Sequence, residues 1–521
     1  MVDLLSYTTE LQKRHENSTS ALYRRQAGQV FTPVEIARFM AGLLSHFPAE
    51  YRLLDAGAGL GVLTAAVCER FFALRSPRHI EVHVFENEPK AIPLLEQNLE
   101  HCRKALEDAG HALNYVIHDK DFIIATASSL DAQRTLDGND LRSTFDAAIM
   151  NPPYFKVRKT SAHAKLMSKV VHGQPNVYAF FLALGAQLLK EGAELVAITP
   201  RSYCNGLYFR GFRKWFLQRM ALDHLHLFES RTAPFKSADV LQESVITKGH
   251  RLGNRSATVR ISTSHGPNLD EDPEGFDVAS DRVIDDSCGE SVLRIPTSNE
   301  DGRIMELVES FPCRFSELGL CISTGPIVMF RATEFLLDDN HSQSSVPLLL
   351  PHNIEPFGTK WPVRKNGKPI AFSLRQESMR LLLPSKNYVL LKRFSAKEER
   401  RRLTAGCFFP SVSKSQYVGI ENHLNYIYHS ERDLTDEDVY GLAAVFNSVL
   451  LDRYFRTISG NTQVNATEIR SMNFPDMNVV AKIGRQVRSL PVMTADRIER
   501  IVLTEFRVRG SLREYLLEHA G

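Results

Sequence analysis

The sequence predicts an α/β fold with a doubly wound, largely parallel sheet, followed by a mixed α+β region. Two observations lead to this prediction. From about Leu53 to Lys248, short β-rich runs alternate with longer runs of helical character, which is typical of parallel strands joined by helices on both faces of a sheet. After Lys248 this alternation fades. The expected strands are residues 51–56, 81–86, 115–118, 145–150, 194–199, 224–228 and 243–248.

The length of the chain indicates more than one domain. A chain of 521 residues is too long for one compact core, so we expect two or three domains. Residues 1–250 contain the alternating pattern and form the first. Residues 251–305 include a stretch rich in Asp, Pro, Gly and Ser, which we interpret as a polar linker or solvated excursion. Residues 306–521 form the last.

Charge and composition exclude several classes of protein. The 63 basic and 61 acidic side chains nearly cancel, so affinity for a polyanion would have to come from local clusters of Lys and Arg. The seven cysteines are scattered and no His cluster has metal-ligand spacing, so we expect a reduced protein without a metal site. The N-terminus lacks a signal-peptide core, and the longest near-apolar stretch, Tyr178 to Leu189, is too short to span a bilayer. We therefore expect a cytoplasmic enzyme without a membrane anchor.

A glycine-rich turn follows the first expected strand. The run LLDAGAGLG places Asp55, Gly57, Gly59 and Gly61 between a strand and a helix. Glycines in such a turn allow the backbone to approach a ligand closely, as in nucleotide-binding loops. The spacing G-x-G-x-G differs from the dinucleotide pattern G-x-G-x-x-G. We predict a nucleoside-like ligand; a plain tight turn is the alternative.

Acidic side chains end the second and third expected strands. Glu86 comes about 25 residues after the glycine turn, where a carboxylate in such folds accepts ribose hydroxyls. Its neighbour Glu88 is the alternative, since an acid there can also favour the start of a helix. Asp121 and Phe122 follow the third strand and suit an adenine amino group and ring, with Asp119 as the competing acid.

The most specific motif is Asn151-Pro152-Pro153-Tyr154, which directly follows the strand FDAAIM. Two consecutive prolines remove two backbone donors and fix the turn, so the Asn151 amide oxygen and the Pro152 carbonyl are presented as acceptors. Two acceptors can hold an amino group, and the ring of Tyr154 can stack on a planar base. We therefore predict that Asn151, Pro152 and Tyr154 form a catalytic site for an amino group.

These motifs together resemble the amino-group DNA methyltransferases. The resemblance implies a seven-stranded class I methyltransferase sheet, a glycine turn that binds S-adenosyl-L-methionine, and an N-P-P-Y motif that holds an adenine flipped out of double-stranded DNA. The upstream segment GQVFTP is similar to the family's N-terminal cofactor motif, which assigns Phe31, Thr32 and Pro33 to the methionine part of the cofactor. This segment, the glycine turn and then N-P-P-Y follow the family's gamma order, in which 1–250 is catalytic and 306–521 recognises the DNA target.

The family also places an aromatic residue after the sixth strand, against the other face of the target base. The match is Phe235 in APFKSADV, with Phe228 as the alternative and ordinary core packing as the competing explanation for both. Longer runs, such as YVLLKRFSAKEERRRL and SGNTQVNATEIR, resemble the PstI and BsuBI type of modification methylase. That resemblance implies adenine-specific methylation within a restriction–modification system, a separately encoded endonuclease, location at the nucleoid, and CTGCAG as a candidate target.

The last region contains two sets of candidate DNA-binding residues. The basic set could contact phosphates, with a solvated helix face as the alternative. The amide set could pair with base edges, with a self-bonded polar loop as the alternative. The basic set is Lys392, Arg393, Arg400, Arg401 and Arg402, and the amide set is Asn461, Gln463 and Asn465.

Two other functions fit parts of the sequence. An N-P-P-Y site suits any planar amide or amine, so a methyltransferase of a protein glutamine or of RNA is one alternative. A non-catalytic DNA-binding specificity subunit that uses the fold as a scaffold is the other. The clustered Arg and Lys of the second half favour a large duplex substrate.

Overall fold

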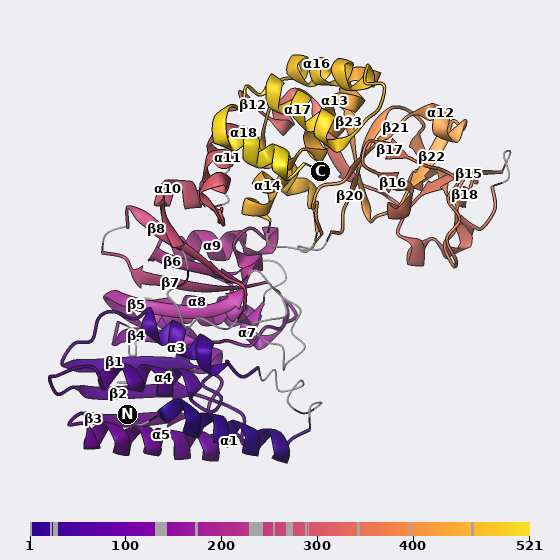
Figure 1. Ribbon diagram of the computed structural model, residues 1–521. Helices are drawn as coiled ribbons and strands as arrows, with labels where there is room; N and C mark the ends of the chain where they lie inside the picture. The colour runs from indigo at the N-terminus through magenta and orange to yellow at the C-terminus, as the bar shows by residue number, and fades with distance from the viewer. Residues whose placement is uncertain are drawn as a thin grey trace. The chain divides into compact units, whose positions relative to one another are not determined.

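A computed structural model gives the architecture of the chain, which divides into two compact units, residues 1–297 and 298–521 (Figure 1). The structure describes residues 3–20, 23, 30–130, 143–171, 176–228, 243–253, 256–266, 273, 275–286, 289, 291–340, 344–395, 399–459 and 463–520. No helix among these residues is long and apolar enough to cross a membrane.

The first unit is built on one twisted sheet with the strand order β3-β2-β1-β4-β5-β7-β6-β8-β9. The strands from β3 to β5 are parallel, and β7 runs antiparallel between β5 and β6. The seven strands predicted from the sequence are β1 to β7, so the doubly wound α/β fold is confirmed. Their bounds are β1 (Glu50–Ala56), β2 (His79–Phe85), β3 (Ala112–His118), β4 (Phe145–Met150), β5 (Leu189–Pro200), β6 (Met220–Phe228) and β7 (Ser244–Arg251).

Successive residues of the central strands enter separate cores on the two faces of this sheet. In β1, Leu53 packs into one core and Leu54 into the other. Because both faces are covered, these strands contain apolar runs, such as AAIM in β4 and LVAI in β5. One core includes side chains of α1 (Leu4–Ser18), α3 (Val34–Gly42), α4 (Val62–Phe71) and α5 (Ile92–Asp108). The other includes α6 (Phe122–Thr126), α8 (Val177–Leu188) and α9 (Arg210–Leu217), while the short α7 (Ala162–Leu166) buries no side chain.

The sheet continues into the segment that was predicted to be a linker or solvated excursion, residues 251–305. Here β8 (Thr258–Ser264) pairs in parallel with β6, and β9 (Gly275–Ala279) pairs antiparallel with β8. Val259 and Ile261 are fully buried, whereas Thr258 at the start of β8 is exposed. The polar composition after residue 264 concealed a short strand, because a strand near the sheet edge needs few apolar residues. Short elements follow: α10 (Ser280–Val283), β10 (Ile284–Asp285) and β11 (Val292–Leu293).

The second unit mixes helices and strands, as predicted, and its strands pair antiparallel except for β15 and β22, which are parallel. One sheet has the order β13-β23-β20-β21 and another the order β14-β18-β15-β22-β19. The first comprises β13 (Leu320–Thr324), β20 (Tyr388–Lys392), β21 (Ala405–Phe408) and β23 (Leu424–His429), and the second β14 (Leu336–Leu337), β15 (Ser345–Leu349), β18 (Ala371–Ser373), β19 (Leu383–Pro384) and β22 (Tyr417–Ile420). Two-residue pairs join β12 (Cys313–Arg314) to β24 (Asn473–Phe474) and β16 (Ile354–Glu355) to β17 (Gly358–Thr359).

The helices of the second unit pack closely enough to need glycine at one crossing. The pair α13 and α16 meets at Gly441 and Gly484, where an added Cβ would lie 2.0 Å from the Val480 oxygen and 1.8 Å from the Glu437 oxygen, respectively. Any side chain at either position would therefore push the helices apart. The helices are α11 (Asn299–Glu309), α12 (Pro410–Ser413), α13 (Asp436–Asn447), α14 (Val449–Ile458), α15 (Ala466–Ser471), α16 (Met477–Arg488), α17 (Ala495–Glu505) and α18 (Gly510–Glu518).

Candidate active site

The glycine turn lies at the carboxyl end of β1 and forms one wall of a pocket. Gly57 and Gly59 have left-handed backbones, with φ of +74° and +58°. A Cβ would lie 3.5 Å from the Phe181 ring at Gly57 and 3.7 Å from the Phe31 ring at Gly59, so both rings flank bare backbone. Such a surface lets a ligand approach the turn closely.

Gly61 has a different role from the other two glycines. It is also left-handed, with φ of +80°, but it stands outside the pocket lining at the N-terminus of α4. A Cβ there would lie 2.9 Å from Leu95 and 3.1 Å from Asn98, both on α5. Gly61 therefore permits helix packing, and a direct ligand contact remains a prediction.

Asp55 is buried behind the turn and its side chain does not line the pocket. Thr64 Oγ1 donates a 2.7 Å hydrogen bond to Asp55 Oδ2. Oδ1 is buried and has no hydrogen-bond partner in the described part of the chain. Burial raises the pKa of Asp55 to about 7, although the bond from Thr64 opposes this. A cofactor contact by Asp55 remains a prediction.

Replacing Asp55 with Asn is expected to make the stability of the ligand-free protein less dependent on pH. An unfolded Asp has a pKa of about 3.9, so between about pH 4 and pH 7 the folded protein retains a proton that the unfolded chain has released. The free energy of unfolding of the wild type should therefore fall as pH rises through this window. Relative to it, Asp55→Asn should gain about 1–3 kcal/mol between pH 5 and pH 8. Urea unfolding at several pH values measures the free energy of unfolding of both proteins. If the two free energies changed with pH in parallel, the prediction would be contradicted. The control is Asp119→Asn, at an exposed position.

Glu86 lies immediately after β2 and borders the same pocket. Its Oε2 accepts the Gly59 N–H at 2.8 Å and its Oε1 accepts the Glu88 N–H at 2.8 Å. Burial raises the pKa of Glu86 above its ordinary value. Glu88, the alternative, does not line the pocket and instead accepts a hydrogen bond from the Tyr23 hydroxyl. The carboxylate beside the glycine turn is therefore that of Glu86.

Asp121 and Phe122 both line the pocket, whereas Asp119 is exposed and does not. Asp121 Oδ1 accepts the Ile124 N–H at 2.9 Å and caps α6, and Oδ2 lies 2.9 Å from His163 Nε2. The Phe122 ring is 3% exposed and lies 5.0 Å from the rings of Phe85 and Phe181, measured between centroids. This places an acidic group next to an aromatic wall.

The Asn151 side chain is fixed at both ends. Its Nδ2 donates to the Val30 carbonyl at 3.2 Å and to Thr32 Oγ1 at 3.0 Å, and its Oδ1 accepts the Tyr154 hydroxyl at 2.7 Å. The amide oxygen has a second lone pair. Asn151, Pro152, Pro153 and Tyr154 all line the pocket that contains the glycine turn.

Tyr154 contributes a hydroxyl donor as well as an aromatic ring. The Ile198 carbonyl lies 3.0 Å from the same hydroxyl and shares its single hydrogen with Asn151 Oδ1. The Tyr154 ring packs edge-on against Tyr178. Burial raises the pKa of Tyr154 far above its ordinary value, so the hydroxyl stays protonated and keeps donating at neutral pH. The sequence predicted the ring as a stacking face but not this bond to Asn151.

The three residues predicted for the N-terminal cofactor motif lie beside this site in different ways. Phe31 lines the pocket, Thr32 is buried and accepts the Asn151 amide, and Pro33 immediately precedes α3. The Ala37 N–H bonds to the Pro33 carbonyl at 2.9 Å. The segment thus connects the glycine turn to the Asn151 turn.

Comparisons with known proteins agree with this geometry. Residues 34–235 match the Eco57I restriction-modification methylase family. Type II methyltransferase M.PstI of Providencia stuartii is 34% identical over 468 residues, covering 89% of this chain and 90% of that protein. Type II methyltransferase M.BsuBI of Bacillus subtilis is 35% identical over 502 residues, covering 96% and 95%. The chain belongs to the type II DNA methyltransferases of restriction–modification systems.

A solved structure supports the fold assignment of this type II methyltransferase. The Type IIL restriction-modification enzyme MmeI, solved in complex with DNA, superposes with a TM-score of 0.55 at 12% identity. The match covers 99% of this chain and 76% of that one. At this identity the likeness concerns the fold alone.

The two candidates for the stacking aromatic of the methyltransferase differ in their positions. Phe235 lies outside them. Phe228, the alternative, ends β6 in the core, 1% exposed, with its ring edge-on to His226 at 4.9 Å. Phe228 does not line the pocket, so the structure excludes it as an accessible stacking ring in this conformation.

Several pocket residues were not singled out from the sequence. Phe85, Lys120, His163 and Phe181 all line the pocket. Phe181 belongs to the apolar run AFFLAL, whose helical character was predicted but whose pocket-facing residue was not. His163 pairs with Asp121 across 42 positions of sequence, a contact without a local signal. Among the described residues, no group of three or more His, Cys, Asp or Glu side chains could hold a metal ion.

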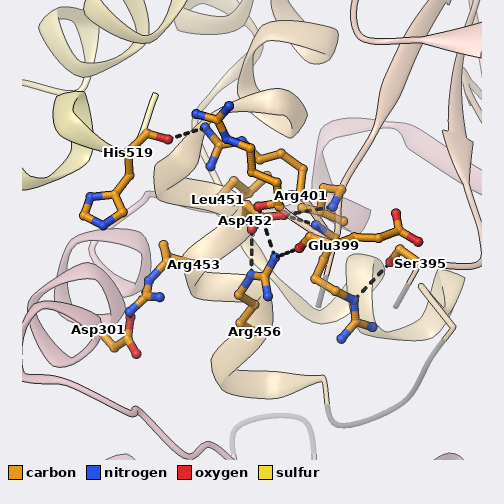
Figure 2. Close-up of polar contacts among 12 residues, drawn as sticks. Asp301, Ser395, Glu399, Arg401, Leu451, Asp452, Arg453, Arg456 and His519 are labelled. Carbon is orange, nitrogen blue, oxygen red and sulfur yellow. Dashed lines mark hydrogen bonds and ion pairs between the residues drawn. The ribbon is translucent and has the colours of Figure 1, made fainter. Parts of the chain in front are cut away.

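The basic run of the second unit separates into exposed and enclosed residues. Arg400 is exposed, while Arg401 Nη2 donates to the His519 carbonyl at 2.9 Å (Figure 2). Arg402 is 2% exposed, its Nε donates to Ser395 at 3.0 Å, and its guanidinium lies over the Phe455 ring. The prediction of a phosphate contact is therefore wrong for Arg402, because its side chain packs inside the unit.

A buried acid holds the segment that carries the basic run. Asp452 is 1% exposed and accepts the backbone N–H groups of Arg402 and Leu403. Its carboxylate also accepts a hydrogen bond from Arg456 Nε (Figure 2). Arg456 also donates to the Glu399 carbonyl at 2.7 Å. The Asp452 carboxylate thus fixes the chain that carries the basic run.

The predicted amide set is also divided by the structure. Asn461 lies outside the described residues. Asn465 precedes α15 and exchanges hydrogen bonds with Glu468, so it follows the self-bonded alternative. Gln463 Oε1 accepts a 3.3 Å bond from Arg393 Nη2, next to Lys392 at the end of β20. Contact of these residues with DNA remains a prediction.

Proposed function

We propose that this type II methyltransferase transfers a methyl group from S-adenosyl-L-methionine to the exocyclic amino group of an adenine flipped out of double-stranded DNA. The observation that carries this proposal is the fixed amide oxygen of Asn151 in the same pocket as the glycine turn and Glu86. The acceptors for an amino group and the residues suited to a nucleoside therefore line the same pocket. A protein glutamine or an RNA base fits the acceptors too, but the family relatives favour DNA.

The residues of the pocket fit S-adenosyl-L-methionine. Gly57 and Gly59 offer bare backbone where a Cβ would fill the space before the Phe31 and Phe181 rings. Glu86 would accept the ribose hydroxyls, and Asp121 with Phe122 would hold the adenine of the cofactor. Phe31 would cover the methionine part. When bound, the cofactor supplies an activated, positively charged methyl donor.

The target base would be held by the Asn151 turn. Leaving the duplex costs a few kcal/mol, which stacking on Tyr154, and on Phe235 if it reaches the site, would offset in part. The second lone pair of Asn151 Oδ1 and the Pro152 carbonyl would accept the two amino hydrogens. Such acceptors draw electron density toward the target nitrogen, and their rigid placement avoids reorganisation during the reaction.

The second unit would recognise the target in this proposal, and a separately encoded endonuclease would cut unmodified DNA. M.PstI and M.BsuBI, which match this chain over most of their length, are both named methyltransferases, and neither name mentions a nuclease. CTGCAG is the target that we propose to test first. Its palindromic sequence would be modified on both strands.

Sequencing of modified bases in DNA from a host without adenine methylation, expressing this chain, tests the proposal. The expected result is N6-methyladenine at one short motif, with a much smaller modified fraction of that motif in a host expressing Asn151→Ala. In parallel, purified chain is incubated with labelled cofactor and DNA, RNA or protein extract. Label in RNA or protein alone, or cofactor binding without transfer to any of them, would overturn the proposal.

A further inference from the structure

Two exposed aromatic side chains meet on the second unit. Phe394 is 42% exposed, the His423 side chain is 44% exposed, and their rings lie 4.7 Å apart at 78°. Phe394 follows β20, and His423 lies in the turn between β22 and β23. A single exposed phenylalanine is ordinary on a protein surface, so this pair is distinguished by its ring contact with a histidine and by the polar groups beside it.

Hydrogen bonds join the backbone segments beneath this pair. The Arg393 N–H bonds to the His423 carbonyl at 2.9 Å, and the Val464 N–H bonds to the Arg393 carbonyl at 2.7 Å. Phe394 also pairs with Gln463 as an antiparallel bridge. Three segments that are distant in sequence are thus joined at one place, and recognition side chains are more precise on such a support than on a free loop.

The His423 ring lies beside a buried acid. Glu421, whose side chain is 1% exposed, accepts the His423 N–H with Oε2 at 2.9 Å, and its Oε1 lies 2.9 Å from His423 Nδ1. The contact between Oε1 and Nδ1 has an ion-pair distance without hydrogen-bond geometry, so it places the imidazole close to the acid.

Gln463 is held by Arg393. The guanidinium donates with Nη1 to the Asn422 carbonyl at 3.0 Å and with Nη2 to Gln463 Oε1 at 3.3 Å. Since Oε1 is used in this way, Gln463 presents its amide N–H groups as donors. Arg393 is then a support that also contributes positive charge, and not a free side chain.

We propose that Phe394, His423 and Gln463 form a base-contact surface that selects the DNA sequence. This inference rests on the proposed function. Duplex DNA is the partner that matches the chemistry: Lys392 and Arg393 supply positive charge, a fixed Gln donates to purine acceptors in the major groove, and an aromatic ring packs on bases or a thymine methyl group. It adds Phe394 and His423 to the residues predicted from sequence and makes Arg393 a positioning residue.

The test compares Phe394→Ala and Gln463→Ala with wild type in a host without adenine methylation, by sequencing modified bases. Both variants are expected to methylate sites that differ from the wild-type motif by one base. With purified proteins, the ratio of methylation at the motif to that at one-base-changed duplexes should fall by about tenfold or more. The salt dependence of binding to unrelated DNA should not change, because no phosphate contact is removed.

Met493→Ala is the matched control, since it removes an apolar side chain of similar exposure, 40%, between α16 and α17. It should retain the wild-type motif. An unchanged motif and ratio in both test variants would overturn the base-contact surface. So would an equal loss at every sequence while Met493→Ala stays active, because that pattern indicates general affinity. No modified adenine with the wild-type chain would instead reject the proposed function, and this inference with it.

Discussion

Replacing Asn151 with alanine is expected to lower the rate of methyl transfer by roughly 10²- to 10³-fold, the loss typical of removing one preorganised hydrogen-bonding group from an active site. The amide oxygen is held by the Tyr154 hydroxyl at 2.7 Å and faces the pocket where the target amino group would lie. Alanine removes this acceptor entirely. Single-turnover rates with saturating cofactor and DNA measure the effect without a contribution from binding.

The hydrogen bonds of Asn151 require a control for its structural role. Its Nδ2 holds the segment of Val30 and Thr32, which adjoins the cofactor pocket. Thr32→Val removes one of these bonds but leaves the acceptor, so its transfer rate should stay within about tenfold of wild type. Tyr154→Phe, which removes the bond to Oδ1 but keeps the ring, should show a loss of about 2- to 10-fold. A near wild-type rate for Asn151→Ala, or an equal loss in Thr32→Val, would show that Asn151 only supports the fold.

Local sequence was sufficient for the strands and for most of the pocket. Parallel strands covered on both faces are rich in apolar residues, and the residues that follow their carboxyl ends meet at one edge of the sheet. For this reason the sequence alone places Glu86, Asp121 and the Asn151 turn together, and all three line one pocket. Because the motifs lie where such strands end, a small error in a predicted strand boundary did not change which residues were expected in the pocket.

The remaining details depend on contacts between distant residues. Gly61 looks like a third ligand-binding glycine, yet its space is taken by Leu95, which lies more than 30 positions further along the chain. Arg402 belongs to a basic run, but Asp452 draws its backbone inward and buries its side chain. Asn465 precedes a Glu three positions later, a recognisable helix-capping pattern that competed with base contact. Only the last of these carried a signal in the sequence.

Glu86→Ala is expected to weaken binding of S-adenosyl-L-methionine by roughly 10- to 100-fold, because charge-assisted hydrogen bonds to two ribose hydroxyls would be lost. In the ligand-free protein the same carboxylate accepts the N–H groups of Gly59 and Glu88, both at 2.8 Å. Glu86→Gln should be affected as well, since one of its amide N–H groups would face a backbone N–H. DNA binding without cofactor should change little, because Glu86 lies in the cofactor pocket.

Isothermal titration calorimetry with the cofactor measures this effect, with Glu88→Gln as the matched control. Glu88 stands two positions away, outside the pocket lining, so its replacement should leave the dissociation constant within a few-fold of wild type. Burial raises the pKa of Glu86, and only the ionised carboxylate accepts both hydroxyls. Wild-type affinity should therefore fall as pH drops through that raised pKa, and Glu86→Gln should lack this part of the pH dependence. An unchanged dissociation constant for Glu86→Gln together with a large loss for Glu88→Gln would move the ribose site to Glu88.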